Sequence, residues 1–318
     1  MMNQADIETF LMLVKTQNIT KTAENLFVSQ PTVSHRLKSL EEELHVPLMV
    51  RRKGYKKVEL TPKGEEFALI ADRWLALLQE TQALQNQDDD LNLRIGCTNT
   101  LNSTIFIELY RQITNNPDLH MRLNIETHYS YQLYEYLENH AIDLGFVYHH
   151  LHFKNIIAEP ILKEKMYIVQ ENSTALRKTR LRVEEMDPKK EVSFIWEANY
   201  QIWHDQMISK GKGVYLEVDE YDLLSEFLKD KGHWAIAPLS VVERLIRQQP
   251  IYVSEIVDAR KPPERITYMI INKDLSETRT KAVTVFRRQM DVYFEKRGLK
   301  TDHPHDDLLG EHKGVCEF

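Results

Sequence analysis

Residues 20–44 read TKTAENLFVSQPTVSHRLKSLEEEL, and this stretch predicts a short helix, a tight turn and a second helix. Ser29 is a favourable N-cap, and Pro31 is tolerated in the first helical turn, whose N–H groups lack helical partners. The second helix has an apolar stripe with spacings of three or four, formed by Val33, Leu37, Leu40 and Leu44. The opposite face carries polar and cationic side chains that suit the DNA major groove: Gln30, Pro31, Ser34, His35 and Lys38.

The composition is that of a soluble globular protein. The 318 residues are 42% hydrophobic and 28% charged, and a chain of this length is expected to form two or three domains. No apolar run approaches the roughly 18–20 residues that a membrane-spanning helix needs. The first residues, MMNQADIETF, lack the basic region and the apolar core of a signal peptide. We therefore expect a cytoplasmic protein without membrane contact.

Charge is unevenly distributed along the chain. The formal net charge is −7, and the acidic excess lies after residue 87. Residues 51–57 instead contain a basic cluster without any acid, formed by Arg51, Arg52, Lys53, Lys56 and Lys57. Local charge governs contact with phosphates, so the net acidity does not argue against DNA binding. The two cysteines, Cys97 and Cys316, are far apart and are expected to be reduced thiols.

The segments around the helix pair complete a small N-terminal domain. Residues 6–15 have a helical apolar stripe, and residues 20–26 and 29–44 form the second and third predicted helices. Residues 48–52 and 57–60 are predicted to be short strands around a turn at Gly54. Such a hairpin is a wing that places cations beside the DNA backbone or in the minor groove.

A long helix is predicted to begin at Thr61, an N-cap followed by Pro62. Six of its residues, all apolar except Thr81, repeat at spacings of three and four, as in a coiled-coil seam: Phe67, Ile70, Trp74, Leu77, Thr81 and Leu84. This stripe could pack on its own domain. We favour an intermolecular contact, because the sequence turns polar over residues 79–90 and no apolar partner helix follows. The tract QNQDDD (85–90) is predicted to end the helix and act as a hinge.

From residue 91 the pattern alternates between short strands and helices. The predicted strands are LRIGC, LNIETH, DLGFVY, KMYIVQ, VSFIW, VYLEV, WAIAP and ITYMII, and the predicted helices are residues 104–115, 131–139, 200–209, 221–229, 239–247 and 277–296. This alternation predicts an α/β fold with a mostly parallel sheet covered on both faces. Eight strands indicate two subdomains, with Pro160 and Pro262–Pro263 as crossing points. Residues after Gly298 are predicted to be a polar, poorly ordered tail.

The N-terminal residues resemble the winged helix-turn-helix of LysR-type transcriptional regulators. The resemblance covers about the first 65 residues, and Met49 departs from it where the family usually has Phe. The matching positions are Ala23, Leu26, Ser29, Gln30, Pro31, Val33, Ser34, Leu40, Glu41, Arg51, Leu60, Thr61 and Gly64.

The resemblance implies a mainly α winged helix-turn-helix (residues 1–61), a linker and dimerisation helix (62–90) and an effector domain like a periplasmic binding protein (91–300). Subdomain I would hold residues 91–161 and 266–300, and subdomain II residues 162–265, with a tail at 301–318. It implies a non-enzymatic regulator, dimeric or homotetrameric, that binds double-stranded promoter DNA. The expected base contacts are Gln30, Pro31, Ser34 and His35, the phosphate contacts Lys38 and Thr32, and the wing residues Arg51, Arg52 and Lys53. Thr20 is a further expected DNA contact.

The effector cleft is expected at the carboxyl ends of the strands, as in other open α/β sheets. The strand ending at Cys97 is followed by hydroxyl and amide side chains, more than a helix cap requires. Residues after three further strands are expected on the same rim. The expected effector-binding residues are Thr98, Asn99, Thr100, Ser103, Tyr148, His149, Trp196, Asn199, Ala237 and Pro238. Trp196 and Tyr148 favour a ligand with flat or apolar surface, bound without any cofactor.

Four alternatives are weaker. A transport receptor would share the β/α half but has no use for the first 90 residues. An enzyme is disfavoured because GxGxxG, P-loop, GxSxG and HExxH motifs are absent. A metal sensor would need ligands at a defined spacing, which the scattered candidates lack: His149, His150, His152, His303, His305, His312 and Cys316. A redox switch through Cys97 would lack a nearby resolving cysteine.

Overall fold

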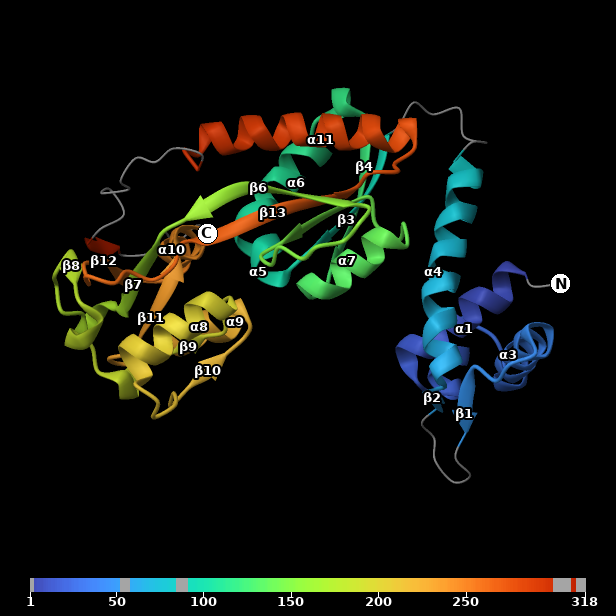
Figure 1. Ribbon diagram of the computed structural model, residues 1–318, viewed down its shortest axis with the longest axis horizontal. Coiled ribbons are helices and arrows are strands. Elements are labelled where there is room, and N and C mark those ends of the chain that lie inside the picture. Colours follow the sequence, from blue (N-terminus) through green and yellow to red (C-terminus); the bar gives the residue numbers. More distant parts are fainter. Residues whose placement is uncertain (1–2, 52–57, 84–90, 300–309, 313–318) are drawn as a thin grey trace. The chain divides into compact units, whose positions relative to one another are not determined.

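The computed structural model describes residues 3–51, 58–83, 91–299 and 310–312 (Figure 1). These residues form two compact units, one built around residues 3–83 and the other around residues 91–299. Within the described ranges, no helix combines the length and the apolar character that a membrane crossing requires.

The first unit is a three-helix domain with a wing and a long helix. Its elements are α1 (Gln4–Thr16), α2 (Ile19–Asn25), α3 (Gln30–Leu44), β1 (Met49–Arg51), β2 (Val58–Leu60) and α4 (Pro62–Ala83). Side chains from α1 and α3 close a core with Leu48, Met49 and Val58. Met49 is buried there, so it packs at the position where the resemblance has Phe.

The predicted caps hold the helix starts. The Ser29 hydroxyl accepts a hydrogen bond from the Thr32 backbone N–H at 3.2 Å, and the Thr61 hydroxyl accepts one from the Gly64 N–H at 2.9 Å. Gly64 is also required by close packing, because a Cβ there would lie 2.0 Å from the Leu48 carbonyl oxygen. The start of α4 is therefore fixed against the strand that leads into the wing.

The wing is an antiparallel pair in which Met49 lies opposite Leu60 and Arg51 opposite Val58. These strands confirm the predicted hairpin. Its tip, residues 52–57, lies outside the described residues, and so do the predicted contacts Arg52 and Lys53. For Arg51 only the backbone is described.

The apolar stripe of α4 has two parts, one packed in the core of the first unit and one exposed. The ring of Phe67 lies 5.1 Å from that of Phe10 on α1, and Ala71 is fully buried. Ile70 and Leu77 point elsewhere and are 59% and 51% exposed. The prediction of a purely intermolecular seam is therefore wrong for Phe67, because the short first unit needs that ring to complete its own core. Leu84 lies outside the described residues.

The second unit has two lobes. Lobe I holds a five-stranded sheet in the order β4-β3-β5-β13-β6. Helices α6 and α11 cover one face of it, and α7 covers the other (Figure 1). Its elements are β3 (Leu91–Cys97), α5 (Asn99–Leu101), a π-helical turn (Asn102–Phe106), α6 (Ile107–Thr114), β4 (Met121–Thr127), α7 (Ser130–Glu138), β5 (Leu144–Val147), β6 (Ile156–Glu164), β13 (Arg265–Asn272) and α11 (Glu277–Lys296).

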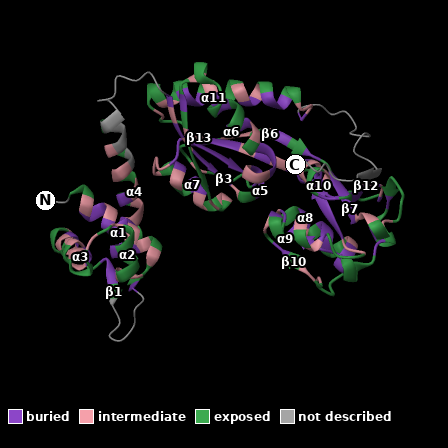
Figure 2. Cartoon of the chain, turned by 180° about the vertical axis from the view of Figure 1, so that it is seen from behind, coloured by how far each residue is buried: buried purple, intermediate pink, exposed green. Residues whose placement is uncertain are grey.

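Lobe II holds the sheet β11-β7-β12-β14, with β8 pairing to β12, and a separate parallel pair of β9 and β10. Its elements are β7 (Met166–Glu171), β8 (Arg180–Leu181), β9 (Ser193–Phe194), α8 (Ala198–His204), β10 (Glu217–Val218), α9 (Tyr221–Phe227), β11 (Trp234–Pro238), α10 (Leu239–Gln248), β12 (Ile251–Ile256) and β14 (Gly310–His312). Buried residues run along the strands of both sheets (Figure 2).

The α/β fold class is confirmed, but the expectation of a mostly parallel sheet is wrong. In lobe I only β3 pairs in parallel, with β4 and β5, whereas β13 is antiparallel to both neighbours. In lobe II β7 is antiparallel to β11 and β12. Two of the antiparallel pairs, β13 with β5 and β11 with β7, join strands that the sequence pattern did predict, so the error lies in the expected pairing direction. The pattern also did not reveal β6 and β12, which are antiparallel to β13 and β7. Strand β6 leads from lobe I into lobe II, and β13 returns.

The two connecting strands lie side by side. Strands β6 and β13 are antiparallel, with Arg265 opposite Glu164 and a bulge between Thr267 and Tyr268. Pro160 lies inside β6, and Pro262–Pro263 precede β13. Both predicted crossing points therefore fall on or beside the connections between the lobes.

Candidate functional site

The outer face of α3 is polar, while its inner face belongs to the core. Val33, Leu37 and Leu40 are buried on the inner face. Arg36 fixes the helix against α1, because its Nη1 donates to the Thr9 hydroxyl at 3.1 Å. Of the predicted DNA contacts, Thr20, Gln30, Pro31, His35 and Lys38 are exposed, while Thr32 and Ser34 are partly buried.

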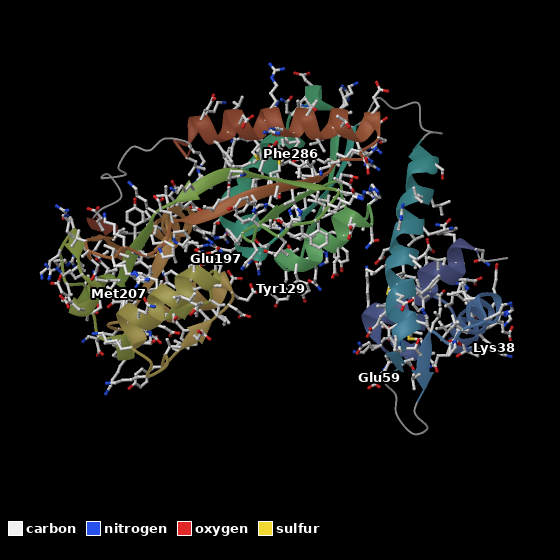
Figure 3. All side chains as sticks on the ribbon, in the orientation of Figure 1. Lys38, Glu59, Tyr129, Glu197, Met207 and Phe286 are labelled. Atoms are coloured by element: carbon white, nitrogen blue, oxygen red, sulfur yellow. The ribbon has the colours of Figure 1, made fainter. Side chains whose placement is uncertain are left out.

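Lys38 illustrates the character of this surface. Its side chain is 73% exposed and projects away from the core of the first unit (Figure 3). Its Nζ lies 3.3 Å from a carboxylate oxygen of Glu42, one turn further along α3. Exposed pairs of this kind hold the side chain weakly, so the ammonium group can exchange Glu42 for a phosphate.

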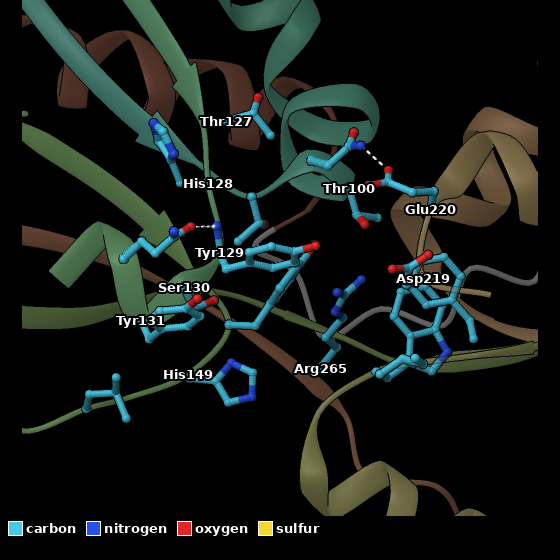
Figure 4. Close-up of a pocket in the computed structure, with 18 residues that line it drawn as sticks. Thr100, Thr127, His128, Tyr129, Ser130, Tyr131, His149, Asp219, Glu220 and Arg265 are labelled. Carbon is cyan, nitrogen blue, oxygen red and sulfur yellow. Dashed lines mark hydrogen bonds between the residues drawn. The ribbon is translucent and has the colours of Figure 1, made fainter. Parts of the chain in front are cut away.

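The second unit contains a pocket of about 620 Å³ between its lobes (Figure 4). Three lining segments follow the carboxyl ends of β3, β4 and β5 in lobe I, and two follow β9 and β10 in lobe II. The sixth contributor is Arg265, the first residue of β13. The full lining is Thr98, Asn99, Thr100, Thr127, His128, Tyr129, Ser130, Tyr131, Gln132, Tyr148, His149, Leu151, Phe194, Ile195, Trp196, Asp219, Glu220 and Arg265.

Arg265 lies between two aromatic rings, one from each lobe. Its Cζ is 3.3 Å from the ring centroid of Tyr148 and 4.2 Å from that of Trp196, and its side chain is only 4% exposed. Its Nε donates to an Oε1 of Glu197 at 2.8 Å. The aromatic faces stabilise the cation while keeping water away from it.

Three polar atoms of the lining are buried without a hydrogen-bond partner in the described part of the chain. They are Nη1 of Arg265 and the hydroxyl oxygens of Thr98 and Tyr148. Burial, partly offset by the Arg265 charge, raises the pKa of Tyr148 well above its ordinary value. The phenol therefore stays protonated at neutral pH, and the pocket lining contains three hydrogen-bond donors without a partner.

The opposite wall is acidic. Asp219 and Glu220 follow β10, and the Asn99 amide donates to Glu220 across the pocket (Figure 4). Burial, together with the charges of Asp219 and Asp222, raises the pKa of Glu220. The pocket thus has a cationic and an acidic side.

The predicted effector residues divide into two groups. Six of them line the pocket: Thr98, Asn99, Thr100, Tyr148, His149 and Trp196. The other four are outside its lining: Ser103, Asn199, Ala237 and Pro238. The Ser103 hydroxyl donates to the Thr100 carbonyl instead, and Ala237 and Pro238 are buried in lobe II where β11 pairs with β7.

Sequence reasoning missed much of the lining. Residues 127–132 could have been found, because they end and follow the predicted strand LNIETH, to which the strand-end rule applies. Arg265 was hidden, because it stands at the amino end of its strand. Only the antiparallel pairing of β13 brings that end beside the carboxyl end of β5.

Neither the redox nor the metal alternative gains a site within the part of the chain that the structure describes. Cys97 is fully buried, and burial raises the pKa of its thiol well above the ordinary value, which leaves it unreactive at neutral pH. Among the described residues, no group of three or more His, Cys, Asp or Glu side chains is arranged to hold a metal ion. The tail residues His303, His305 and Cys316 lie outside the described residues, and the His312 side chain is not described.

Two family models match the chain. Residues 5–65 match the bacterial regulatory helix-turn-helix protein, lysR family, and residues 86–292 match the LysR substrate binding domain. The chain belongs to the LysR family. The resemblance seen in its first 65 residues is confirmed, and this LysR-family protein is a DNA-binding transcriptional regulator with a substrate-binding effector domain. Members of the family are regulators and not enzymes.

Relatives and solved structures agree with this assignment. The HTH-type transcriptional regulator YraN of Bacillus subtilis is 24% identical over 281 residues, which cover 86% of this chain and 92% of YraN. The structure of full-length CbnR complexed with its target DNA is 19% identical, with a TM-score of 0.67 over 92% of this chain and all of CbnR. A full-length OxyR variant from Pseudomonas aeruginosa is 21% identical, with a TM-score of 0.63 over 96% of this chain and 99% of OxyR. These likenesses establish the fold.

Proposed function

We propose that this LysR-family regulator reads promoter DNA with the outer face of α3. The observation that carries the proposal is the division of one helix into a buried apolar stripe and an exposed polar face. Gln30, Pro31, Ser34 and His35 would meet base edges, and Lys38 with Thr32 would meet phosphates. Thr20 and the wing cations Arg51, Arg52 and Lys53 would add contacts beside the groove. Full-length CbnR, whose structure is known with its target DNA, has the same fold.

The second half of the proposal is that a small molecule in the pocket controls DNA binding. The pocket volume is within the range of small-molecule sites, and its wall comes from both lobes. A ligand there contacts groups on either side of the connecting strands, so it stabilises one arrangement of the lobes over others.

A genomic selection tests both halves. Full-length protein is incubated with sheared genomic DNA at moderate ionic strength, and bound fragments are sequenced. We expect a shared promoter sequence to be enriched. Metabolites that raise the melting temperature of the protein should then change its affinity for that fragment. Absence of any enriched sequence would contradict DNA reading, and stabilising metabolites that never alter DNA affinity would contradict effector control.

We also propose that α4 joins two copies of the chain, in a dimer or as part of a tetramer. Ile70 and Leu77 are spaced seven residues apart, and both are exposed in the single chain. A second α4 could cover them in a coiled-coil contact. The double variant Ile70→Glu/Leu77→Glu should halve the mass measured by light scattering. Glu66→Gln, an exposed change on the same helix, should leave the mass unchanged, and an unaltered mass in the double variant would exclude this interface.

A further inference from the structure

Arg265 has a buried hydrogen-bond donor in the second unit that the rest of the described chain does not satisfy. Its guanidinium group is almost fully buried, yet its Nη1 has no hydrogen-bond acceptor in the described part of the chain. Buried cationic donors are normally paired, because an unpaired one loses its hydration without replacement. Figure 4 shows the group projecting between the Tyr129–Tyr131 segment and the Asp219–Glu220 wall. The missing acceptor is therefore expected to come from a ligand.

The two nearby carboxylates do not supply it. Glu197 uses its Oε1 for the Arg265 Nε. Glu164, opposite Arg265 in the strand pair, uses its Oε1 for the Ser240 N–H at 2.7 Å. The other carboxylate oxygen of Glu164, Oε2, is buried without a hydrogen-bond partner among the residues described, so it does not accept from Nη1 either. Nη1 thus keeps its donor for the pocket.

Two further donors accompany Arg265. The Thr98 hydroxyl, at the end of β3, and the Tyr148 hydroxyl, at the end of β5, line the same pocket and are also buried without partners in the described ranges. A guanidinium and two hydroxyl groups match the several lone pairs of a carboxylate. A neutral carbonyl oxygen could accept a hydrogen bond, but it would not supply a negative charge to balance the guanidinium group.

The remaining wall is aromatic. Tyr129 and Tyr131 stack at 6.3 Å with an interplanar angle of 4°, and both are more than half exposed. Phe194 and Trp196 stack at 4.0 Å on the lobe II side. Phe194 and Trp196 are themselves buried, so the exposed rings of Tyr129 and Tyr131 are the flat surface on which a ring of the ligand can stack.

The acidic side limits the charge of the ligand. Asp219 and Glu220 stand across the pocket from Arg265, so a second negative charge at that end of a ligand would be repelled. From these observations we propose that the effector is an aromatic monocarboxylate whose carboxylate is held by Arg265, Thr98 and Tyr148. The inference rests on the proposed function of the pocket as the effector site.

Calorimetry on the full-length protein tests the proposal with three acids and their primary amides. The acids are phenylacetate, indole-3-acetate and 4-hydroxybenzoate, and each amide keeps the ring but removes the charge. We expect at least one acid to bind and its amide to bind about 10- to 100-fold more weakly, the usual effect of losing charge-assisted hydrogen bonds. Equal binding of acid and amide, or no binding by any of the six compounds, would overturn the proposal.

Variants then locate the carboxylate. Arg265→Met should weaken binding of the acid about 100-fold, and Arg265→Lys less severely, because Lys keeps the charge without the planar fork. Arg244→Met is the matched control, since Arg244 also lies over an aromatic ring, that of Tyr221, but outside the pocket lining. It should leave the acid affinity unchanged. Unchanged affinity in Arg265→Met would overturn the proposal.

A milder change keeps the test valid if Arg265→Met does not fold. Thr98→Val removes one of the three donors with little change of shape, and it should weaken the acid several-fold but not the amide. Equal effects on both compounds would overturn the donor arrangement.

Asp219→Asn should strengthen acid binding about two- to threefold, because it removes one negative charge from the opposite wall. If the acids bind as expected but leave promoter affinity unchanged, the anchor stands and the effector role fails.

Discussion

The outer face of α3 and the interlobe pocket are built in opposite ways. Lys38 on α3 is mostly exposed and pairs with a neighbour on its own helix, Glu42. Arg265 is buried between rings from two lobes and pairs with Glu197. One surface is formed by 15 consecutive residues, whereas the pocket collects residues from six separate segments. Side chains on the outer face of α3 can therefore change without disturbing the fold. The pocket, by contrast, depends on the buried contacts that hold its six segments in place.

The largest effect should come from a residue that lines neither site. The Asp143 carboxylate, just before β5, accepts from the Arg94 backbone N–H at 2.8 Å and from its Nη2 at 2.7 Å. It also accepts from Arg279 of α11 at 3.2 Å. Because Asp143 is buried, Asp143→Asn should leave two cations poorly compensated and lower the free energy of unfolding by about 3–5 kcal/mol.

Tryptophan fluorescence during denaturant unfolding measures this loss, because Trp196, Trp203 and Trp234 all belong to the second unit. Ligand binding should be lost with the fold of that unit, while the first unit keeps its structure. The control is Asp118→Asn, which removes an exposed acid from lobe I. A loss below about 1 kcal/mol would mean that the pocket framework does not depend on this cluster.

A change on α3 should have the reverse profile, altering function without altering stability. Gln30→Ala removes an exposed amide that can bond a base edge, so discrimination between promoter and random DNA should fall by about 1–3 kcal/mol. Competition binding with both DNAs measures this difference, and the unfolding free energy should stay within about 0.5 kcal/mol of the parent. Gln4→Ala, an exposed change on α1, should leave discrimination intact. Equal weakening on both DNAs would remove Gln30 from the base-reading set.

The same contrast explains what the sequence could predict. Helix α3, its cap at Ser29 and its polar face follow from residues within one helix length, and the helix of residues 277–296 was predicted with the bounds of α11. Strand-end reasoning found Thr98, Tyr148 and Trp196, because each ends or directly follows a strand of the predicted pattern. It could not find Arg265, whose position depends on the direction of β13 and on its pairing with β5 and β6. Pairing direction depends on contacts between distant segments, which no local spacing encodes.

The smallest effect is expected at Lys38, where the contact with DNA is electrostatic. Lys38→Ala should weaken promoter and random DNA alike and lower the slope of log affinity against log salt by about 0.9 for each bound copy of the helix. Lys63 is a matched control, because it is also exposed and pairs with a glutamate on its own helix, Glu66, but lies on α4. Lys63→Ala should leave the slope unchanged. A loss of promoter affinity alone in Lys38→Ala would show that this ammonium group reads a base, and α3 would then carry sequence recognition one turn further than proposed.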